Sequence, residues 1–267
     1  MRKILPLMLV VTLAGCTAHS RQVDIDNDND NDNDTAKKIN DIIENQVKPA
    51  NKDNPGEIIK NVSYKFLNTP YAANKLIGSP AEPEKLVIDF SGLDCFTFLD
   101  YVESLRKSND QNDFIEKLIQ TRYIDGKINF LQRKHFFTDW STRKKLNAKD
   151  VTDEISASYI KITKNLNIKP DGSEYIPGLG VIKRDIKYIP GDKVNDSVIK
   201  NLKTGDYIGI YTHLAGLDVT HTGIFIMTDH GPMLRNASSL AANKKVVDSP
   251  FLEYVKNKPG IIVLRAL

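Results

Sequence analysis

The amino-acid sequence predicts a single α+β domain, in which helices come first and antiparallel strands follow. Apolar residues recur at helical spacing before residue 125, whereas short apolar runs of strand length dominate after residue 205. Helices and strands that are segregated along a chain are typical of α+β domains rather than of alternating α/β folds. No internal repeat is visible. The 267 residues are 40% hydrophobic and 27% charged, which excludes a low-complexity chain and suffices for a large core.

The N-terminus has the features of an export signal. Two basic residues precede an apolar run over residues 4–14, which is too short to span a bilayer. The run ends in Gly15-Cys16 and resembles the lipobox of bacterial lipoproteins. This resemblance implies a lipoprotein signal peptide over residues 1–15 and a membrane anchor on Cys16, the alternative being a plain signal peptide with an incidental cysteine. Thr17 is not the Asp that favours inner-membrane retention, so we expect an outer-membrane protein that faces the periplasm.

Residues 16–38 are predicted to form the lipid anchor and an acidic linker. Asp and Asn alternate almost strictly from residue 24 to residue 34, and such a segment cannot bury apolar surface and repels itself into an extended coil. A calcium-binding loop is the sharper alternative, but the segment lacks the turn glycine and the terminal glutamate of such a loop. We therefore expect the globular domain over residues 39–267.

The net charge of +3 conceals an uneven distribution. Residues 1–34 contain three basic and six acidic side chains, so the remaining body carries 34 basic and 28 acidic residues and a net charge of +6. A basic body suits an anionic polymer. Export, and the lack of an arginine-rich stripe interleaved with aromatic residues, argue against a nucleic-acid partner.

Helical apolar spacing predicts helices in the N-terminal half, over residues 41–47, 57–67 and 113–123 and from about residue 92 to residue 107. Ser91 is followed three residues later by Asp94, which matches a capping box and predicts that Ser91 caps the helix that ends at about residue 107. In the second helix the apolar residues form one face, and a proline at residue 70 follows its end.

The second half of the chain is predicted to be rich in strands. Residues 130–200 mix short apolar runs with Pro and Gly, which predicts irregular structure and short strands. Further strands are predicted over residues 207–211, 221–227, 233–237, 244–247 and 261–264. Asp229-His230-Gly231 predicts a hairpin turn, and Ser249-Pro250 predicts the start of a short helix.

Cys95 is the candidate nucleophile. Two cysteines cannot form a disulfide framework, and lipidation of Cys16 would leave Cys95 as the only free thiol of the mature protein. Cys95 lies in the first turn of a predicted helix, where the macrodipole favours a thiolate. A buried cysteine that acts only as a small hydrophobic residue is the alternative interpretation.

A cysteine nucleophile needs a general base, and His221 is the candidate for that role. His221 opens the most apolar predicted strand, and Asn236 on the next predicted strand could orient its imidazole. His135 and His213 are rivals for the same role. No His-x-x-x-His or Cys-x-x-Cys spacing occurs, so we predict neither a metal nor a cofactor.

Several short motifs occur in the order found in a known protein family. They run from about residue 57 to residue 265 and include Thr69-Pro70-Tyr71, Asp94-Cys95-Phe96-Thr97-Phe98, Phe137-Thr138-Asp139-Trp140, Asp218-Val219-Thr220-His221-Thr222-Gly223-Ile224, Asn236-Ala237-Ser238-Ser239 and Lys245-Val246-Val247-Asp248. With these motifs the sequence resembles the NlpC-type papain-like cell-wall amidases. More closely, it resembles the N-acetylmuramoyl-L-alanine amidase-like family of exported bacterial proteins (domain of unknown function 1460).

The resemblance implies a papain-like fold in which a helix N-terminus presents Cys95 to an antiparallel sheet. It also implies that Cys95 is the nucleophile, that His221 is the general base and acid, and that residue 236 orients the imidazole. The family usually has His at this position, whereas this chain has Asn236, whose side-chain carbonyl can accept the imidazole N–H. Tyr71 matches a tyrosine of the nucleophile pocket, where its phenol could help the Cys95 backbone amide bind an oxyanion, although packing of the helix entry is the alternative.

The reaction that the resemblance implies is cysteine-dependent hydrolysis of a peptidoglycan amide bond, between N-acetylmuramic acid and L-alanine. Three alternatives stay open: an endopeptidase that cuts the stem peptide after D-glutamate, acyl transfer to an amine, and a tethered protein that binds cell wall without catalysis. The expected partners are peptidoglycan or muropeptides and, through Cys16, a membrane. The sequence carries no prediction of the oligomeric state.

Overall fold

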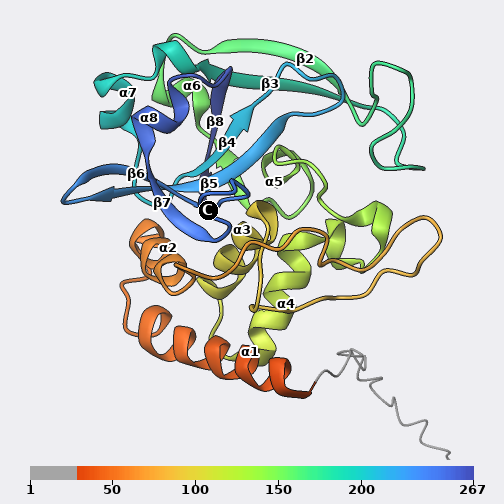
Figure 1. Ribbon diagram of the computed structural model, residues 1–267, viewed down its shortest axis with the longest axis vertical. Coiled ribbons are helices and arrows are strands. Elements are labelled where there is room, and N and C mark those ends of the chain that lie inside the picture. Colours follow the sequence, from red (N-terminus) through yellow and green to blue (C-terminus); the bar gives the residue numbers. More distant parts are fainter. Residues whose placement is uncertain (1–28) are drawn as a thin grey trace, which may run out of the picture.

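The computed structural model describes residues 29–267, in which a group of N-terminal helices packs below an antiparallel sheet (Figure 1). The predicted signal peptide and the predicted lipidation site Cys16 lie outside the described residues. Helices dominate the first half of the described chain and strands the second half. The α+β class predicted from the sequence is thus confirmed.

Four α-helices and one π-helical turn make up the N-terminal half: α1 (Asn29–Ile42), η1 (Ile43–Val47), α2 (Pro55–Tyr64), α3 (Cys95–Leu105) and α4 (Gln111–Arg122). Helix α1 begins inside the segment 16–38 that the sequence predicts as an extended linker. Thr35, Ile39 and Ile42 recur at helical spacing and are buried, and Thr35 Oγ1 accepts a hydrogen bond from the backbone N–H of Phe90 (3.3 Å). The last part of the predicted linker therefore belongs to the folded body.

Helix α3 has a different cap from the predicted one. The Asp94 carboxylate accepts hydrogen bonds from the backbone N–H groups of Phe96 (3.0 Å) and Thr97 (2.7 Å), and the Thr97 hydroxyl accepts one from the Asp94 N–H (3.0 Å). This reciprocal capping box uses Asp94 rather than Ser91, which lies exposed before the helix. As a result, Cys95 is the first residue of α3.

The segment predicted as irregular contains a long hairpin. Strands β2 (Ile160–Leu166) and β3 (Ile182–Pro190) pair antiparallel over the whole of β2. The prolines and glycines that suggested irregular structure lie mainly in the connecting loop over residues 167–181. The other elements of this segment are short: η2 (Ile124–Gly126), η3 (Phe130–Gln132), α5 (Asp139–Thr142), β1 (Ala148–Asp150), α6 (Thr152–Ile155), η4 (Gly191–Lys193) and α7 (Asp196–Asn201).

The last third of the chain forms most of the sheet: β4 (Tyr207–Tyr211), β5 (Val219–Thr228), β6 (Gly231–Ala237), β7 (Val246–Pro250) and β8 (Gly260–Ala266), with helix α8 (Phe251–Val255) between β7 and β8. These strands confirm the five that the sequence predicts. The strand order is β2-β3-β8-β4-β5-β6-β7, with β1 paired to β8, and every pairing is antiparallel.

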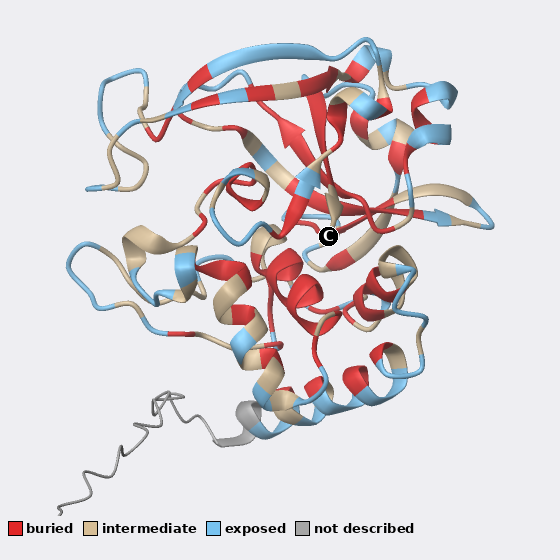
Figure 2. Ribbon diagram, turned by 180° about the vertical axis from the view of Figure 1, so that it is seen from behind, coloured by how far each residue is buried: buried red, intermediate tan, exposed pale blue. Residues whose placement is uncertain are grey.

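The sheet separates two hydrophobic clusters. The larger one lies between the sheet and helices α1–α5, and the smaller one lies between the sheet and helices α6–α8. Ile224 of β5 belongs to the first cluster and its neighbour Phe225 to the second, as the pleat of a strand requires. Buried residues accordingly concentrate where the helices meet the sheet (Figure 2). Helices α3 and α8 therefore lie on opposite sides of β5.

Buried ion pairs fix the C-terminal end of α3. Glu103 is fully buried, and its carboxylate accepts hydrogen bonds from Arg106 (2.5 and 2.8 Å) and from the Tyr207 hydroxyl (2.6 Å). Lys107 forms an ion pair with the same carboxylate, and Arg106 also donates to an oxygen of Leu267 (2.9 Å). This network ties α3 to strand β4 and to the last residue of the chain.

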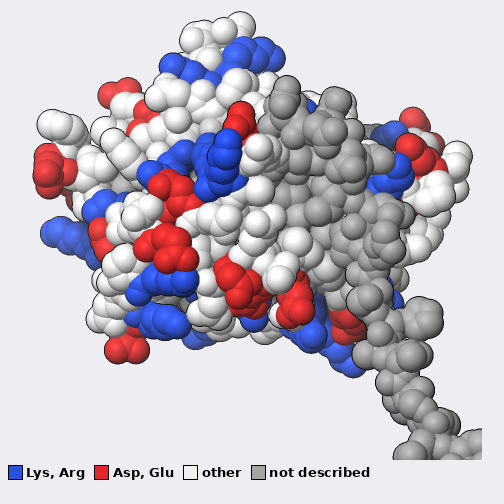
Figure 3. All heavy atoms as spheres, turned by 90° about the horizontal axis from the view of Figure 1, so that it is seen from below, with Lys and Arg blue, Asp and Glu red and all other residues white. Residues whose placement is uncertain are grey.

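The described surface beside α1 carries basic and acidic side chains close together (Figure 3). Both signs of charge are interspersed on this face, so it does not present a large field of one sign. Within residues 29–267, none of the helices combines the length and the apolar character needed to cross a membrane.

Candidate active site

The position of Cys95 is fixed by the cap of α3 and by strand β5. The hydroxyl of Thr222 donates a hydrogen bond to the carbonyl oxygen of Cys95 (2.8 Å). Thr222 directly follows His221, so this bond brings the start of α3 to the part of β5 that carries the candidate base. Cys95 is partly exposed.

The side chains of His221 on β5 and Asn236 on β6 are joined directly. Oδ1 of Asn236 lies 3.0 Å from Nε2 of His221. The amide nitrogen of Asn236 donates to the carbonyl oxygen of Leu234 (3.0 Å) and to Oγ of Ser249 (3.2 Å), so the amide presents its oxygen to the imidazole. Nε2 of His221 therefore carries a hydrogen, and Nδ1 is the nitrogen that can accept a proton.

The Cys95 thiol is protonated in the resting site. Burial raises the pKa of this thiol, and the neighbouring Asp94 carboxylate raises the pKa further. Hydrogen bonds from Thr222 lower the pKa only in part. Burial and the Asp94 charge thus act against the thiolate that the helix macrodipole is expected to favour.

The imidazole of His221 is held in its neutral form. Burial lowers its pKa, the hydrogen bond to Asn236 raises it in part, and the charge of Lys258 lowers it again. A neutral imidazole can accept a proton from a protonated thiol, and the Thr222 bond brings the start of α3 to the residue that follows His221. The site can thus form the Cys95 thiolate during a reaction rather than hold it in the resting state.

Tyr71 lies beside Cys95 on the segment that precedes α3. Its backbone N–H donates to the carbonyl oxygen of Lys244 (2.8 Å), and it forms an isolated bridge with Leu93, two residues before Cys95. Burial raises the pKa of the Tyr71 phenol, and the charge that a Cys95 thiolate would carry raises the pKa further. The phenol therefore remains protonated and can donate a hydrogen bond toward the nucleophile.

Tyr254 of α8 borders the same site, although the sequence-based prediction assigns it no role. Its ring centroid lies 6.0 Å from that of His221, with 32° between the planes. Burial raises the pKa of the Tyr254 phenol, and the charge of a Cys95 thiolate raises the pKa further. The only sequence signal was an aromatic residue in a short helix after Pro250, a pattern that is more typical of core packing.

The rival histidines lie in other environments. His135 bonds through Nε2 to the carbonyl oxygen of Phe130 (2.7 Å) and packs against the Phe130 ring. His213 is exposed and packs edge-on against Tyr211. In the part of the chain that the structure describes, no group of three or more His, Cys, Asp or Glu side chains could hold a metal ion.

Most of this chain is similar in sequence and structure to known proteins. Residues 61–261 match the AmiA-like family, described as N-acetylmuramoyl-L-alanine amidase-like. Two crystal structures of an N-acetylmuramoyl-L-alanine amidase from Bacteroides uniformis are similar. One is 31% identical, with a TM-score of 0.64, over 80% of this chain and 99% of that chain. The other is 30% identical, with a TM-score of 0.63, over 79% of this chain and 98% of that chain.

A protein from Legionella pneumophila has the same fold, with a TM-score of 0.74 and 22% identity over 89% of this chain and 96% of that chain. Among curated proteins, no relative matches the sequence. The family match spans most of the chain and includes Cys95, His221 and Asn236. The chain therefore belongs to the N-acetylmuramoyl-L-alanine amidase-like family.

Proposed function

We propose that this protein is a cysteine-dependent amidase that hydrolyses the bond between N-acetylmuramic acid and L-alanine in peptidoglycan. The observation that carries the proposal is the bond between Asn236 Oδ1 and His221 Nε2, which leaves Nδ1 as the base for Cys95. Membership of the family supports the substrate class. The identities of 30% and 31% to the Bacteroides uniformis amidase support the choice of bond.

In the first half of the reaction, Nδ1 of His221 takes the Cys95 proton while Sγ attacks the carbonyl carbon of the amide. Because the pKa of the resting thiol is raised, proton transfer accompanies the attack rather than preceding it. The oxyanion that forms can accept hydrogen bonds from the Cys95 backbone N–H, which has no partner within the helix, and from the Tyr71 hydroxyl. Asn236 holds the imidazolium in place through Nε2.

In the second half, the imidazolium protonates the nitrogen of L-alanine and the C–N bond breaks. The muramic acid side remains as a thioester on Cys95. His221 then takes a proton from water, whose oxygen attacks the thioester carbonyl, and collapse of the second oxyanion returns the thiol. The products are an intact stem peptide with a free amino group and a glycan with a free lactyl carboxylate.

Digestion of purified muropeptides, followed by mass spectrometry, tests the proposal. We expect wild-type protein to release intact stem peptides, and Cys95→Ala and His221→Ala to lose at least about 10³-fold in kcat. Wild-type turnover in either variant would contradict the mechanism. Stem peptides cut after D-glutamate would identify an endopeptidase, new amine adducts an acyl transferase, and sacculus binding without cleavage a non-catalytic wall binder.

We further propose that acyl chains on Cys16 anchor the enzyme in the outer membrane, facing the periplasm. The support is the sequence of residues 1–17, with its basic start, its short apolar run and its lipobox-like end. We expect labelled palmitate to be incorporated into wild-type protein in bacterial cells and not into Cys16→Ala. Equal labelling of the two proteins would contradict the anchor.

A further inference from the structure

Two lysines lie over the two tyrosines that border Cys95. The ammonium of Lys244 is 5.6 Å from the centroid of the Tyr71 ring, and that of Lys258 is 5.3 Å from the centroid of the Tyr254 ring. Cation–π contacts of this length are attractive and hold the ammonium over the ring face. We call Lys244 and Lys258 the lysine rim. Lys244 precedes α8 in the chain and Lys258 follows it. Two separate segments therefore each place a lysine over a tyrosine that borders Cys95.

The backbone of both rim residues is held in place. Lys244 has a φ of +48°, a left-handed conformation that costs energy for a residue with a Cβ, and its carbonyl oxygen binds the Tyr71 N–H. The Lys258 N–H donates to Val255 (2.9 Å). A Cβ on Gly191 would come within 2.2 Å of the Lys258 carbonyl oxygen, so the turn that carries Lys258 packs closely on η4. The backbone positions from which the two lysine side chains extend are therefore set by the fold.

The rim charges are available to a ligand. Lys244 and Lys258 are exposed, and within residues 29–267 neither forms an ion pair with an acidic side chain. The acid nearest to the nucleophile, Asp94, already accepts hydrogen bonds from the backbone N–H groups at the start of α3. The charge of Lys258 is felt at His221, whose pKa it lowers. A cationic rim with little local compensation attracts anionic groups of a substrate.

We propose that the lysine rim binds the free α-carboxylate of D-glutamate in the stem peptide, and that the enzyme thereby selects acidic over amidated stems. This inference rests on the proposed function, because it places the scissile amide at Cys95. D-Glutamate is joined to L-alanine at its amino group and continues through its side chain, so its α-carboxylate remains free unless it is amidated. It lies roughly two residues, or about 7 Å of extended chain, beyond the scissile bond. This distance is comparable to that of the Lys244 and Lys258 ammonium groups, each of which is separated from Cys95 by one aromatic ring.

Two substrates that differ in one group test the proposal: N-acetylmuramoyl-L-alanyl-D-isoglutamate and N-acetylmuramoyl-L-alanyl-D-isoglutamine. We expect wild-type kcat/KM to be about tenfold higher for the carboxylate than for the amide at low ionic strength, since exposed charge pairs are weakened by salt. In the double variant Lys244→Met, Lys258→Met, kcat/KM for the carboxylate should fall to the value for the amide. At a pH above the acid limb of the His221 titration, hydrolysis of the amide should stay within about twofold of wild type, because Met keeps the apolar stem and removes only the charge.

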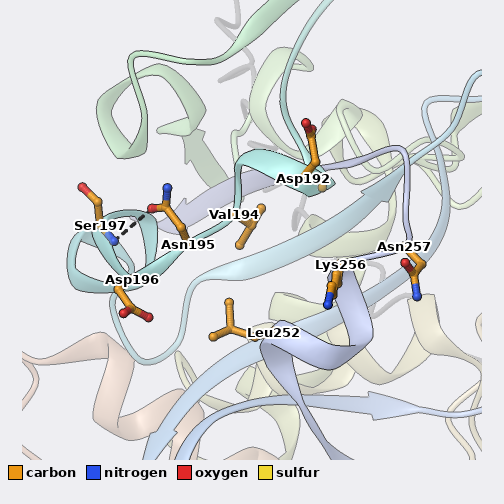
Figure 4. A pocket seen from close by; sticks show the side chains of 9 residues that line it. Asp192, Val194, Asn195, Asp196, Ser197, Leu252, Lys256 and Asn257 are labelled. Atoms are coloured by element: carbon orange, nitrogen blue, oxygen red, sulfur yellow. Dashed lines mark hydrogen bonds between the residues drawn. The ribbon is translucent and has the colours of Figure 1, made fainter.

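Lys256→Met is the matched control. Lys256 is also exposed and lies on the same short stretch of chain, but with Leu252 it borders a separate open groove of about 650 Å³ between α8 and α7 (Figure 4). Leu252 and Lys256 are four residues apart and share one face of the helix, while Tyr254 between them faces His221. We expect Lys256→Met to leave the preference for the carboxylate unchanged.

The possible outcomes separate this inference from the proposed function. Equal kcat/KM of wild-type protein for the two substrates, or an equal loss on both in the double variant, would overturn the lysine rim while the amidase proposal stands. If wild-type protein cuts neither substrate, the amidase proposal fails. Calorimetry with Cys95→Ala protein then still tests the lysine rim through binding alone. The carboxylate ligand should bind more tightly than the amide ligand when both lysines are present, and equally tightly when both are replaced.

Discussion

The two ends of helix α3 are built from different kinds of contact. At the N-terminal end, Cys95 is partly exposed and accepts a hydrogen bond from Thr222, the neighbour of His221, and His221 bonds to the neutral amide of Asn236. At the C-terminal end, Glu103 is fully buried and its carboxylate is bound by Arg106, Lys107 and the Tyr207 hydroxyl. One helix thus carries a reactive group at one end and a charged anchor at the other.

This difference follows from what each end has to do. In the proposed mechanism a proton passes between Cys95 and His221, so neither group can be locked into a permanent ion pair. The anchor must keep α3 in register with the sheet, and a buried carboxylate tolerates removal from water only when all its partners stay in place. We therefore expect changes at Glu103 to act on stability and changes around His221 to act on rate.

The largest effect is expected from Glu103→Ala. Removing this carboxylate leaves Arg106 buried without its partner, and such a loss costs about 3–5 kcal/mol of the free energy of unfolding. Chemical denaturation measures this change. The rate per folded molecule should stay within about threefold of wild type, and Cys95→Ala should show the reverse pattern, with an unchanged unfolding midpoint.

The same carboxylate adds a pH dependence to stability. Burial raises the pKa of Glu103, but the charges of Arg106 and Lys107 and their hydrogen bonds outweigh burial, so the net pKa lies below its ordinary value of 4.5. A carboxyl with a lowered pKa in the folded state stabilises the fold above the unfolded pKa, and this stabilisation is lost as the pH falls through the folded pKa. The stability gap between wild type and Glu103→Ala should therefore narrow below about pH 4.5. A constant gap across that range would contradict the assignment of the anchor to this carboxylate.

An intermediate effect is expected from Asn236→Ala. Loss of the Oδ1 acceptor frees the imidazole to rotate and leaves Nε2–H without its partner, so kcat/KM should fall by about 10²-fold. Ser249→Ala is the milder control, because it removes only one of the two bonds that orient the amide, and it should cost a few-fold. Steady-state kinetics on a muropeptide measures both. If unfolded protein accounts for the whole loss of activity in Asn236→Ala, residue 236 acts on stability. The expected difference between the two ends of α3, rate at one and stability at the other, would then be wrong.

The smallest effect is a shift in the pH profile of Lys258→Met. The charge of Lys258 lowers the pKa of His221, so its removal should raise that pKa and move the acid limb of kcat/KM to higher pH. The isoglutamine substrate is suited to this measurement, because it lacks the carboxylate that the lysine rim is proposed to bind. Lys256→Met should leave the limb in place. A limb that moves to lower pH would contradict the assignment of the limb to His221.

Much of the fold could be predicted because its apolar periodicity is local. The strands β4, β5, β6, β7 and β8 and the helices α2 and α4 lie within a few residues of their predicted positions. Helix α1 could not, because its acidic start is typical of a linker and its buried face depends on packing against Phe90, 55 residues away along the chain. Where the long hairpin β2–β3 lies, the sequence predicts only irregular structure and short strands, because the glycine- and proline-rich loop of the hairpin dominates the local composition.

By itself, the sequence determined the α+β class, the order of the elements and the residue types of the site, because these depend on short-range pattern and on motifs kept in order. Only the tertiary structure decided the protonation state of Cys95 and the tautomer of His221, since burial and hydrogen-bond partners come from distant segments. It also brought Tyr254 and the lysine rim close to Cys95, from which they are more than 140 residues away in the chain. Chemistry that depends on desolvation and on charge at a distance is decided by the packed fold.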